Sequence, residues 1–398
     1  MVARVRTSLH PLRGLVVLDF SRVLAGPLCT QLLADSGARV IKIEEPGRGD
    51  ETRRWGPPFV NGISAYFLSV NRNKQSMTLN LKSAGGRRIA RELMARADVV
   101  VENFLPAQKA SLRFPDPRRG NRRVIHCTIS GFDSDTPDAD TPGYDLLAQA
   151  GAGLMAINGE PDGDPMKVGV ALSDVLTAHH AFGAICAALT GRAVNDRGCR
   201  LEISLFAATA ASLVNVAQNA LLTKLEGARQ GNAHASIVPY QLFHASDRPF
   251  AVGVGTDRHY ERLCRDVLGR PDLLSPRFAS NAKRVQNRST LLPLLEAAFR
   301  IRTASSWVRS CRKAGIPVSL VLGVLEALRS PSGNAVVETV QHAQLGSYRA
   351  VGNPVLVDGA RRRTRLAPPA LGADTDSILR QLLYSRAEIV DMRERGVV

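Results

Sequence analysis

Short apolar runs alternate with helix-like segments in the first third of the chain. The run LVVLDF at residues 15–20 predicts a buried strand, the segment after Pro27 predicts a helix, and RVIKIE at residues 39–44 predicts a second strand. A strand, a helix and a strand in this order build parallel sheets. The intervening turn, Ala25-Gly26-Pro27, lacks the G-x-G-x-x-G fingerprint of nicotinamide and flavin sites. The pattern therefore predicts an α/β, Rossmann-like sheet without a dinucleotide signature.

The same pattern continues to residue 130. It predicts a helix at residues 83–96 and strands at residues 98–104 and 123–130, with polar or aromatic residues after each strand. Asn-Arg-Asn-Lys at residues 71–74 interrupts a strand-like pattern with donors that we expect only a ligand or solvent to satisfy. Because parallel sheets bind ligands at the carboxyl ends of their strands, we expect these groups to meet at one edge.

Asp174 stands between a short β-branched run with a glycine and a long helix pattern rich in small residues. We predict a strand-to-helix junction at this point. A carboxylate there accepts hydrogen bonds from free N–H groups, and the helix dipole favours its ionised form. On this segment alone, Asp174 or its neighbour Ser173 is best interpreted as an ordinary helix cap, so a chemical role needs support from the rest of the chain.

The pattern changes beyond residue 205, where short strands and amphipathic helices replace the earlier alternation. We expect a large discontinuous domain at residues 1–205 and 325–398, a linker helix at residues 206–230 and a small α+β domain at residues 231–324. The C-terminal segment from Leu379 predicts one helix that packs back on the large domain.

Charge and composition narrow the range of partners. The chain has 398 residues, 44% of them hydrophobic, and a formal charge of +16. The basic residues are dispersed and cluster only at residues 118–123 and 361–365. They are not interleaved with aromatic residues. We therefore expect no nucleic-acid partner and attribute the charge to a polyphosphorylated small molecule.

Cysteine usage and hydropathy indicate the compartment. Six scattered cysteines without C-x-x-C pairs predict buried thiols in a reducing environment, with neither disulfides nor a metal site. The basic N-terminus lacks the apolar core of a secretory signal, and no run of 18 apolar residues occurs. We expect a cytoplasmic protein that makes no membrane contact.

Several motifs occur together in an order and spacing that resemble the class III CoA-transferase family, of the formyl-CoA transferase and carnitine CoA-transferase type. The resemblance covers essentially the whole chain. The matching pieces are Leu24-Ala25-Gly26-Pro27, VIKIEEPGRGD at residues 40–50, residues 71–74, LNLK at residues 79–82, VENF at residues 101–104, ISGF from Ile129, Gly143-Tyr144-Asp145, the Asp174 junction, GNAHASIVPYQLF from Gly231 and AGIPVS from Ala314. The segment from Trp55, SIVPYQ from Ser236 and the closing GVV look most like the succinyl-CoA:glutarate branch.

This resemblance implies covalent catalysis by Asp174. Its carboxylate would attack an acyl-CoA thioester to form an aspartyl anhydride and then an aspartyl-CoA thioester, from which an acceptor carboxylate takes the CoA. Backbone N–H groups would stabilise the oxyanions, and a lowered pKa at the helix start would keep the nucleophile ionised. The CoA-binding positions implied by the family motifs, or predicted from the strand ends, are Leu24, Ala25, Asn71, Arg72, Lys74, Leu79, Lys82, Asn103, Phe104 and Tyr144.

The resemblance also implies the assembly and the ligands. Two ring-like chains, each with a Rossmann-like large domain and a small domain, would interlock as an obligate homodimer. CoA and acyl-CoA would be substrates, with no permanently bound cofactor. The donor would be succinyl-CoA and the acceptor a dicarboxylate such as glutarate, whose far carboxylate needs a cation. Candidates in the small domain are Arg229, His234 and Arg258.

The chain departs from the family pattern at three places. Glu45 occupies a position that often holds Arg, so the phosphate-binding cation is lost or moved to Arg48, Arg53 or Arg54. In the segment at residues 106–123, Pro106-Ala107 replaces the usual Pro-Gly, and residues 113–123 read RFPDPRRGNRR where the family has a Gly-Leu helix pattern. The glycine-rich loop of formyl-CoA transferases has no counterpart, which disfavours oxalate and formate as substrates.

Two other functions compete with CoA transfer. A 2-methylacyl-CoA racemase of the same superfamily would place a base where Tyr144 stands, and a phenol is a weak base near neutral pH. His179 and His180 lie in an apolar helix pattern and are better interpreted as core residues. A non-catalytic protein that binds CoA or nucleic acid is the other alternative.

Overall fold

The computed structural model describes residues 9–398. Residues 1–8, most of the basic N-terminus interpreted above as non-secretory, lie outside them. The chain forms two compact units, one of residues up to Leu154, Lys167–Leu225 and Pro331–Val398, the other of Met155–Met166 and Glu226–Ser330. The segment expected as one linker helix at residues 206–230 instead contains most of α7 (Leu205–Ala211) and all of α8 (Asn215–Thr223).

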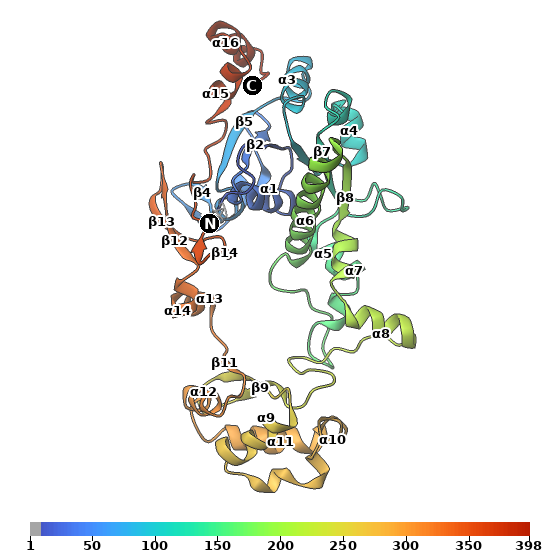
Figure 1. Cartoon of the computed structure of the whole chain (residues 1–398), viewed down its shortest axis with the longest axis vertical. Helices are drawn as coiled ribbons and strands as arrows, with labels where there is room; N and C mark the ends of the chain where they lie inside the picture. Colours follow the sequence, from blue (N-terminus) through green and yellow to red (C-terminus); the bar gives the residue numbers. More distant parts are fainter. Residues whose placement is uncertain (1–8) are drawn as a thin grey trace, which may run out of the picture. The chain divides into compact units, whose positions relative to one another are not determined.

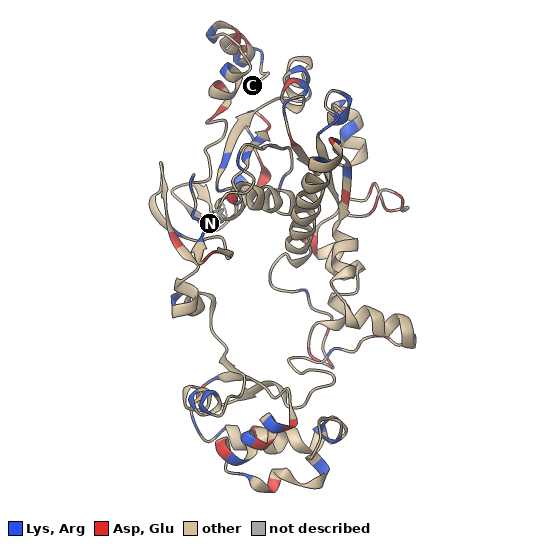
Figure 2. Cartoon of the chain, in the orientation of Figure 1, with Lys and Arg blue, Asp and Glu red and all other residues tan. Residues whose placement is uncertain are grey.

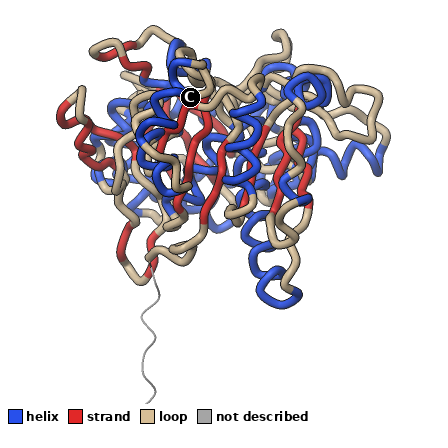
Figure 3. Tube along the Cα trace, turned by 90° about the horizontal axis from the view of Figure 1, so that it is seen from above, coloured by secondary structure: helices blue, strands red, loops and turns tan. Residues whose placement is uncertain are grey.

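A six-stranded parallel sheet forms the centre of the first unit, as the sequence predicts. Its strands in chain order are β1 (Val16–Asp19), β2 (Arg39–Glu44), β5 (Lys74–Thr78), β6 (Val99–Glu102), β7 (Ile125–Ser130) and β8 (Arg200–Ser204). Their spatial order is β5-β2-β1-β6-β7-β8, and every neighbouring pair is parallel. Figure 3 shows these strands side by side among the helices that cover them. This order is that of a doubly wound sheet.

The two faces of the sheet follow the alternation of residues along its strands. Val17 and Val40 pack with α1 (Ala25–Asp35), α6 (Leu172–Asn195) and α7 in one core. Leu18 and Ile41, one position further along each strand, pack in the opposite core. The helices of that second core are α3 (Ala84–Met94), α15 (Thr375–Gln381) and α16 (Arg386–Glu394), which Figure 1 shows together beside β5. Successive side chains therefore point to opposite helix layers.

The strand order reverses between β1 and β6. The chain leaves β1 toward β2 and β5 on one side, and β6 toward β7 and β8 on the other. The carboxyl ends of β1 and β6 diverge there, and doubly wound sheets bind ligands in the resulting crevice. The segments that follow the two strands, from Phe20 and from Asn103, therefore border the expected binding edge.

Residues 165–171 form no strand, so the predicted strand-to-helix junction before Asp174 is wrong. A loop enters α6 instead. With a mean hydropathy of 1.3, α6 is long and apolar enough to cross a membrane. It packs on α1, α7, β7 and β8, which identifies it as a helix of the first unit's core.

The C-terminal tail packs on the first unit, as expected, but as two helices rather than one. Leu383 has a positive φ between α15 and α16, and Ser385 starts α16 with a capping box completed by Glu388. Side chains of the tail also cover the edge strand β5: Asp374 accepts from the N–H of Ser76, and Thr375 accepts from that of Thr78.

The second unit is a small α+β fold. Its antiparallel sheet has the order β11-β10-β9, formed by β9 (Tyr240–His244), β10 (Pro249–Gly253) and β11 (Val318–Leu320). Aromatic rings of Phe243, Phe250 and Trp307 pack around Phe299 in its core. Its helices are α9 (Asp257–Arg262), α10 (Asn281–Gln286), α11 (Arg288–Phe299), α12 (Ala304–Lys313) and α13 (Val324–Arg329).

Shorter elements complete the first unit. They are β3 (Phe59–Val60), β4 (Ile63–Ser64), α2 (Ala65–Val70), α4 (Pro106–Leu112), α5 (Asp145–Gly151), α14 (Pro331–Asn334), β12 (Val337–His342), β13 (Gly346–Val351), β14 (Leu356–Val357) and β15 (Ala360–Arg361). All six cysteines are free, four of them buried.

Candidate active site

Asp174 lies in the first turn of α6, as its third residue, and does not cap that helix. Its half-buried side chain lines a cavity of about 210 Å³ at the carboxyl end of the sheet. Ala25, Asn103 and Tyr144, all predicted from the sequence, line the same cavity. The backbone N–H of Ala25, the first residue of α1, lies close enough to the Asp174 carboxylate to lower its pKa. The starts of α1 and α6 therefore meet at one carboxylate.

Asp145 provides the cap that Asp174 does not. Its Oδ1 accepts a hydrogen bond of 2.8 Å from the N–H of Ser173, and Gln149 donates to its Oδ2 at 2.7 Å. This second carboxylate lies close enough to Asp174 to oppose its ionisation. Two carboxylates therefore lie at the start of α6. Asp145 caps the helix, and Asp174, within its first turn, lines the cavity.

The pKa of Asp174 is raised to about 7, so the expected lowering is wrong. Burial contributes most, because it penalises the charged form, and repulsion from Asp145 adds to it. The N–H of Ala25 lowers the pKa but does not compensate. The helix start fails to lower the pKa because Asp145, rather than Asp174, takes the free N–H group of α6.

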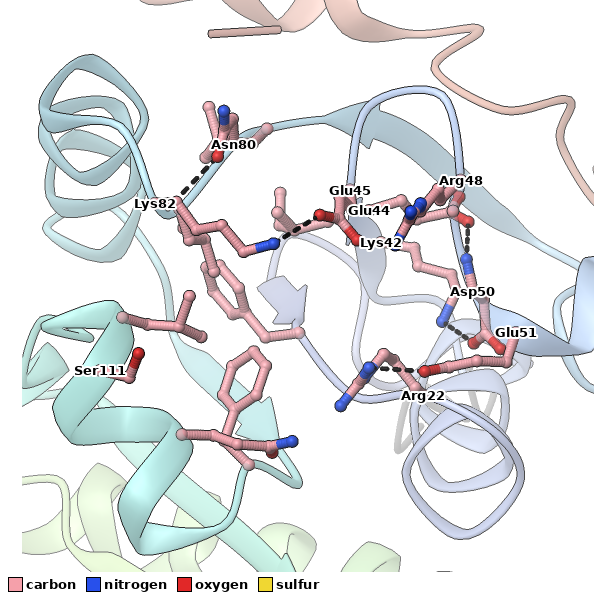
Figure 4. Close-up of a pocket in the computed structure, with 18 of the residues that line it drawn as sticks. Arg22, Lys42, Glu44, Glu45, Arg48, Asp50, Glu51, Asn80, Lys82 and Ser111 are labelled. Carbon is pink, nitrogen blue, oxygen red and sulfur yellow. Dashed lines mark hydrogen bonds and ion pairs between the residues drawn. The ribbon is translucent and has the colours of Figure 1, made fainter. Parts of the chain in front are cut away.

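A larger cavity of about 540 Å³ adjoins the first. Arg22, Glu51, Phe104 and Gln108 line both cavities, so the two lie side by side. Figure 4 shows Lys82 and Arg48 on its walls, together with the ion pair between Arg22 and Glu51. Leu79 and Phe104 add apolar surface. The smaller cavity contains the Asp174 carboxylate, and the larger one is lined by both cations and carboxylates.

Glu45 stands where the family often has Arg, so other cations must line the larger cavity. Lys82 Nζ pairs with Glu45 at 3.0 Å, and both side chains are exposed. Arg48 and Arg54 also line the cavity. Arg53 does not, because its guanidinium pairs with Glu44 at 2.7 Å and lies over the ring of Phe67. Of the three replacements considered, Arg48 and Arg54 remain available to a phosphate.

Asn71, Arg72 and Lys74 line neither cavity. Lys74 Nζ contacts Asp19 at 3.0 Å and the Asn71 amide oxygen at 2.9 Å, and it is fully buried. Arg72 pairs with Asp35 at 2.6 Å. The expectation that only a ligand or solvent satisfies these donors is wrong, because buried carboxylates and backbone carbonyls of the chain itself satisfy them. We assign these three residues a structural role.

The remaining predicted positions lie in different places. Leu24 precedes α1 and lines neither cavity. Arg229, His234 and Arg258 belong to the second unit. The Arg229 guanidinium donates to the backbone carbonyls of Ala156, Glu160 and Gly163. His234 Nδ1 accepts from the N–H of Ser236. Arg258 is exposed.

Sequence reasoning missed four residues of the site. Trp55 lines the smaller cavity and contacts the ring of Tyr66. Burial raises the pKa of Tyr66 to about 12, and the charges of Asp174 and Asp145 contribute. Asp50, which lines the larger cavity, and Asp145 occur within recognised motifs, yet nothing in the spacing of Asp145 indicates how close it lies to Asp174. Only the folded chain brings them together.

Charge elsewhere on the chain is dispersed. Figure 2 shows lysines and arginines on both units rather than gathered on one surface. Within residues 9–398, no group of three or more His, Cys, Asp and Glu side chains is arranged to hold a metal ion.

The fold and the site combine a doubly wound α/β sheet with a half-buried carboxylate beside a large cavity lined by several cations. The model of CoA-transferase family III matches residues 12–375, and the chain belongs to that family. It is therefore a transferase that uses CoA thioesters as substrates.

Relatives of known activity match nearly the whole chain. The succinyl-CoA:glutarate CoA-transferase of Mus musculus is 38% identical over 397 residues, covering 98% of this chain and 91% of the relative. The acetyl-CoA:oxalate CoA-transferase of Acetobacter aceti is 39% identical over 353 residues, covering 88% and 90%. A crystal structure of a CAIB/BAIF family protein from Brucella suis has a TM-score of 0.84 and 34% identity, covering 94% of this chain and 100% of that one.

Proposed function

We propose that this enzyme transfers CoA from succinyl-CoA to a dicarboxylate such as glutarate, with Asp174 as the nucleophile. The observation that carries the proposal is the Asp174 carboxylate in a cavity beside a larger one whose lining includes Lys82, Arg48 and Arg54. Similarity to succinyl-CoA:glutarate CoA-transferases from Mus musculus and to the succinate–glutarate CoA-transferase from Agrobacterium fabrum supports the substrates.

The reaction proceeds through two kinds of covalent intermediate. The Asp174 carboxylate attacks the thioester carbonyl, which forms a mixed anhydride and expels the CoA thiolate. The thiolate attacks the aspartyl carbonyl of that anhydride, releasing succinate and leaving an aspartyl-CoA thioester. The acceptor carboxylate then attacks this thioester, giving a second anhydride and free thiolate. Attack of the thiolate on the acceptor carbonyl yields the new acyl-CoA and restores Asp174.

CoA lies along the two neighbouring cavities in this proposal. Lys82, with Arg48 and Arg54, binds the phosphates, while Leu79 and Phe104 contact the apolar parts of the ligand. Ala25, Asn103 and Tyr144 border the reacting end. The N–H of Ala25, already directed at the carboxylate, stabilises the negative charge that develops on the tetrahedral oxygen.

The acceptor and the assembly belong to the same proposal. Arg258 and His234 are candidate partners for the far carboxylate of the acceptor, and Arg229 is a weaker one because backbone carbonyls occupy its donors. The enzyme is cytoplasmic, consistent with its six free cysteines, and functions as an interlocked homodimer. Exposed apolar side chains on α8, Leu221 and Leu222, support an interface.

A panel of acceptors tests the proposal. With succinyl-CoA as donor, we expect glutarate to give glutaryl-CoA and succinate in equal amounts, and oxalate to react more slowly. The Asp174→Asn variant should retain its fold and lose transfer. Transfer by Asp174→Asn at the wild-type rate would contradict the proposal. Deuterium incorporation at the α-carbon of a 2-methylacyl-CoA would indicate the racemase instead.

A further inference from the structure

Val23 has an unusual backbone conformation beside the active site. Its φ is 72°, in the left-handed region that β-branched residues rarely adopt. It lies between the end of β1 and the start of α1, and it lines the cavity that contains Asp174. Strain of this kind persists only where neighbouring groups hold the backbone in place, and it occurs preferentially at functional sites.

A buried carboxylate holds Val23 from one side. Asp50 accepts from the Val23 N–H through both oxygens, each at 3.3 Å. Lys42 Nζ contacts Asp50 at 2.8 Å and also donates to the carbonyl of Ser21 at 2.9 Å. Neither side chain of this ion pair is exposed to bulk solvent; both line the larger cavity, and Figure 4 shows the contact between them. Both groups remain charged, because the pKa of Asp50 is lowered and that of Lys42 is raised against the effect of burial.

The side chain of Asn103 holds the backbone of the neighbouring residue, Arg22, by two hydrogen bonds. Asn103 accepts from the N–H of Arg22 at 3.1 Å and donates to its carbonyl at 3.0 Å. Gly26 lies so close to Ser21 that a Cβ at Gly26 would be 2.2 Å from the Ser21 hydroxyl. The turn from residue 21 to residue 26 is therefore held at several points, and it ends in the N–H of Ala25 that meets Asp174.

We propose that Asp50 is a positioning residue for CoA transfer: by holding Val23 in its left-handed conformation, it directs the first N–H of α1 at Asp174. This inference rests on the proposed role of Asp174 as nucleophile. The alternative is that Asp50 only neutralises the buried charge of Lys42. The two roles differ in one respect, since only the positioning role depends on the conformation of Val23.

Two substitutions test the proposal together: Asp50→Ala removes the carboxylate that holds Val23, and Val23→Gly relieves the backbone strain at that residue. In Asp50→Ala, we expect kcat to fall about tenfold or more, with the KM for succinyl-CoA changed by no more than about threefold. The acid limb of the pH profile should move to higher pH, because displacement of the Ala25 N–H raises the pKa of Asp174 further. Adding Val23→Gly should recover most of kcat, because glycine adopts a positive φ without help.

Two further variants separate positioning from stability. Asp35→Asn breaks another buried ion pair, with Arg72, so it should lower Tm but leave the pH profile unchanged. If Asp50→Ala does not fold, Lys42→Met/Asp50→Leu removes both charges together, and Val23→Gly is tested in that background. Recovery of kcat by Val23→Gly supports the inference. Unchanged kcat on loss of Asp50, or no recovery by Val23→Gly, overturns it. An active Asp174→Asn variant would instead contradict the proposed function.

Discussion

Asp174 combines two properties that oppose each other. A nucleophilic carboxylate must be ionised, yet burial and the charge of Asp145 raise its pKa to about 7. About half of the free enzyme therefore carries the reactive form at neutral pH. Removal of water from the carboxylate also leaves it poorly solvated, which favours attack on a thioester carbonyl.

The pH dependence of kcat/KM tests this balance. Because the ionised form reacts, activity should rise with pH through a midpoint near 7 and fall at lower pH as Asp174 binds a proton. Asp145→Asn should move the midpoint to lower pH, since it removes the repelling charge and keeps an oxygen to cap α6. Asp135→Asn, which alters an exposed loop, is the control and should leave the midpoint in place. A midpoint near 4 in the wild type would contradict the account.

At the scale of residues, sequence reasoning located the candidate carboxylate but not its electrostatics. The importance of Asp174 follows from its motif context. The direction of its pKa depends on Asp145, a residue of another helix, and no local pattern indicates that contact. The wrong interpretation of residues 71–74 has the same cause. Arg72 pairs with Asp35 and Lys74 with Asp19, and both carboxylates come from distant parts of the sequence.

Among the elements, the approach of two loops positions the start of α5. Gly131, after β7, and Gly143, before α5, pack so closely that a Cβ on Gly143 would lie 2.1 Å from the Cα of Gly131. Both line the cavity of Asp174. This contact sets the position of Tyr144 and Asp145, which follow directly.

Gly143→Ala should therefore impair both stability and catalysis. We expect a loss of about 1–3 kcal/mol in the free energy of unfolding, typical of overpacking, together with a lower kcat. Denaturant unfolding and steady-state kinetics measure the two effects. Gly120→Ala is a matched control, because a Cβ there meets nothing within 4 Å. Equal stability of the two variants would show that the loops are not in tight contact.

The helices and strands of the sheet follow from periodicity, while the connections do not. Short, mostly apolar runs predict β1, β2, β6 and β7, since each of these strands is buried against helices on both faces. The strand predicted before α6 is a loop, because a short β-branched run does not show whether a partner strand is present to pair with it. The break between α15 and α16 depends on the capping box at Ser385, which the helical pattern obscured.

For the molecule as a whole, the order of the strands explains where the site lies. The reversal between β1 and β6 opens the crevice, and the residues after those strands line both cavities. The formal charge of +16 is spread over both units, so only the cations at the larger cavity bear on CoA. The sequence thus predicted the type of sheet, and the structure added the cavities.

The proposed homodimer is tested by the mass in solution. Light scattering should give about twice the chain mass of 42.9 kDa. Leu222→Glu should reduce this mass, because it places a charge on an apolar side chain that is 74% exposed in the single chain. A wild-type protein of one chain mass would contradict the proposed assembly.

Covalent capture of the enzyme by its donor tests the central claim most directly. After incubation with succinyl-CoA and brief treatment with hydroxylamine, mass spectrometry of the digested protein should locate the hydroxamate on the peptide containing Asp174. The Asp174→Asn variant should give none. Modification of another carboxylate, or transfer to glutarate without any modified Asp174, would contradict the account.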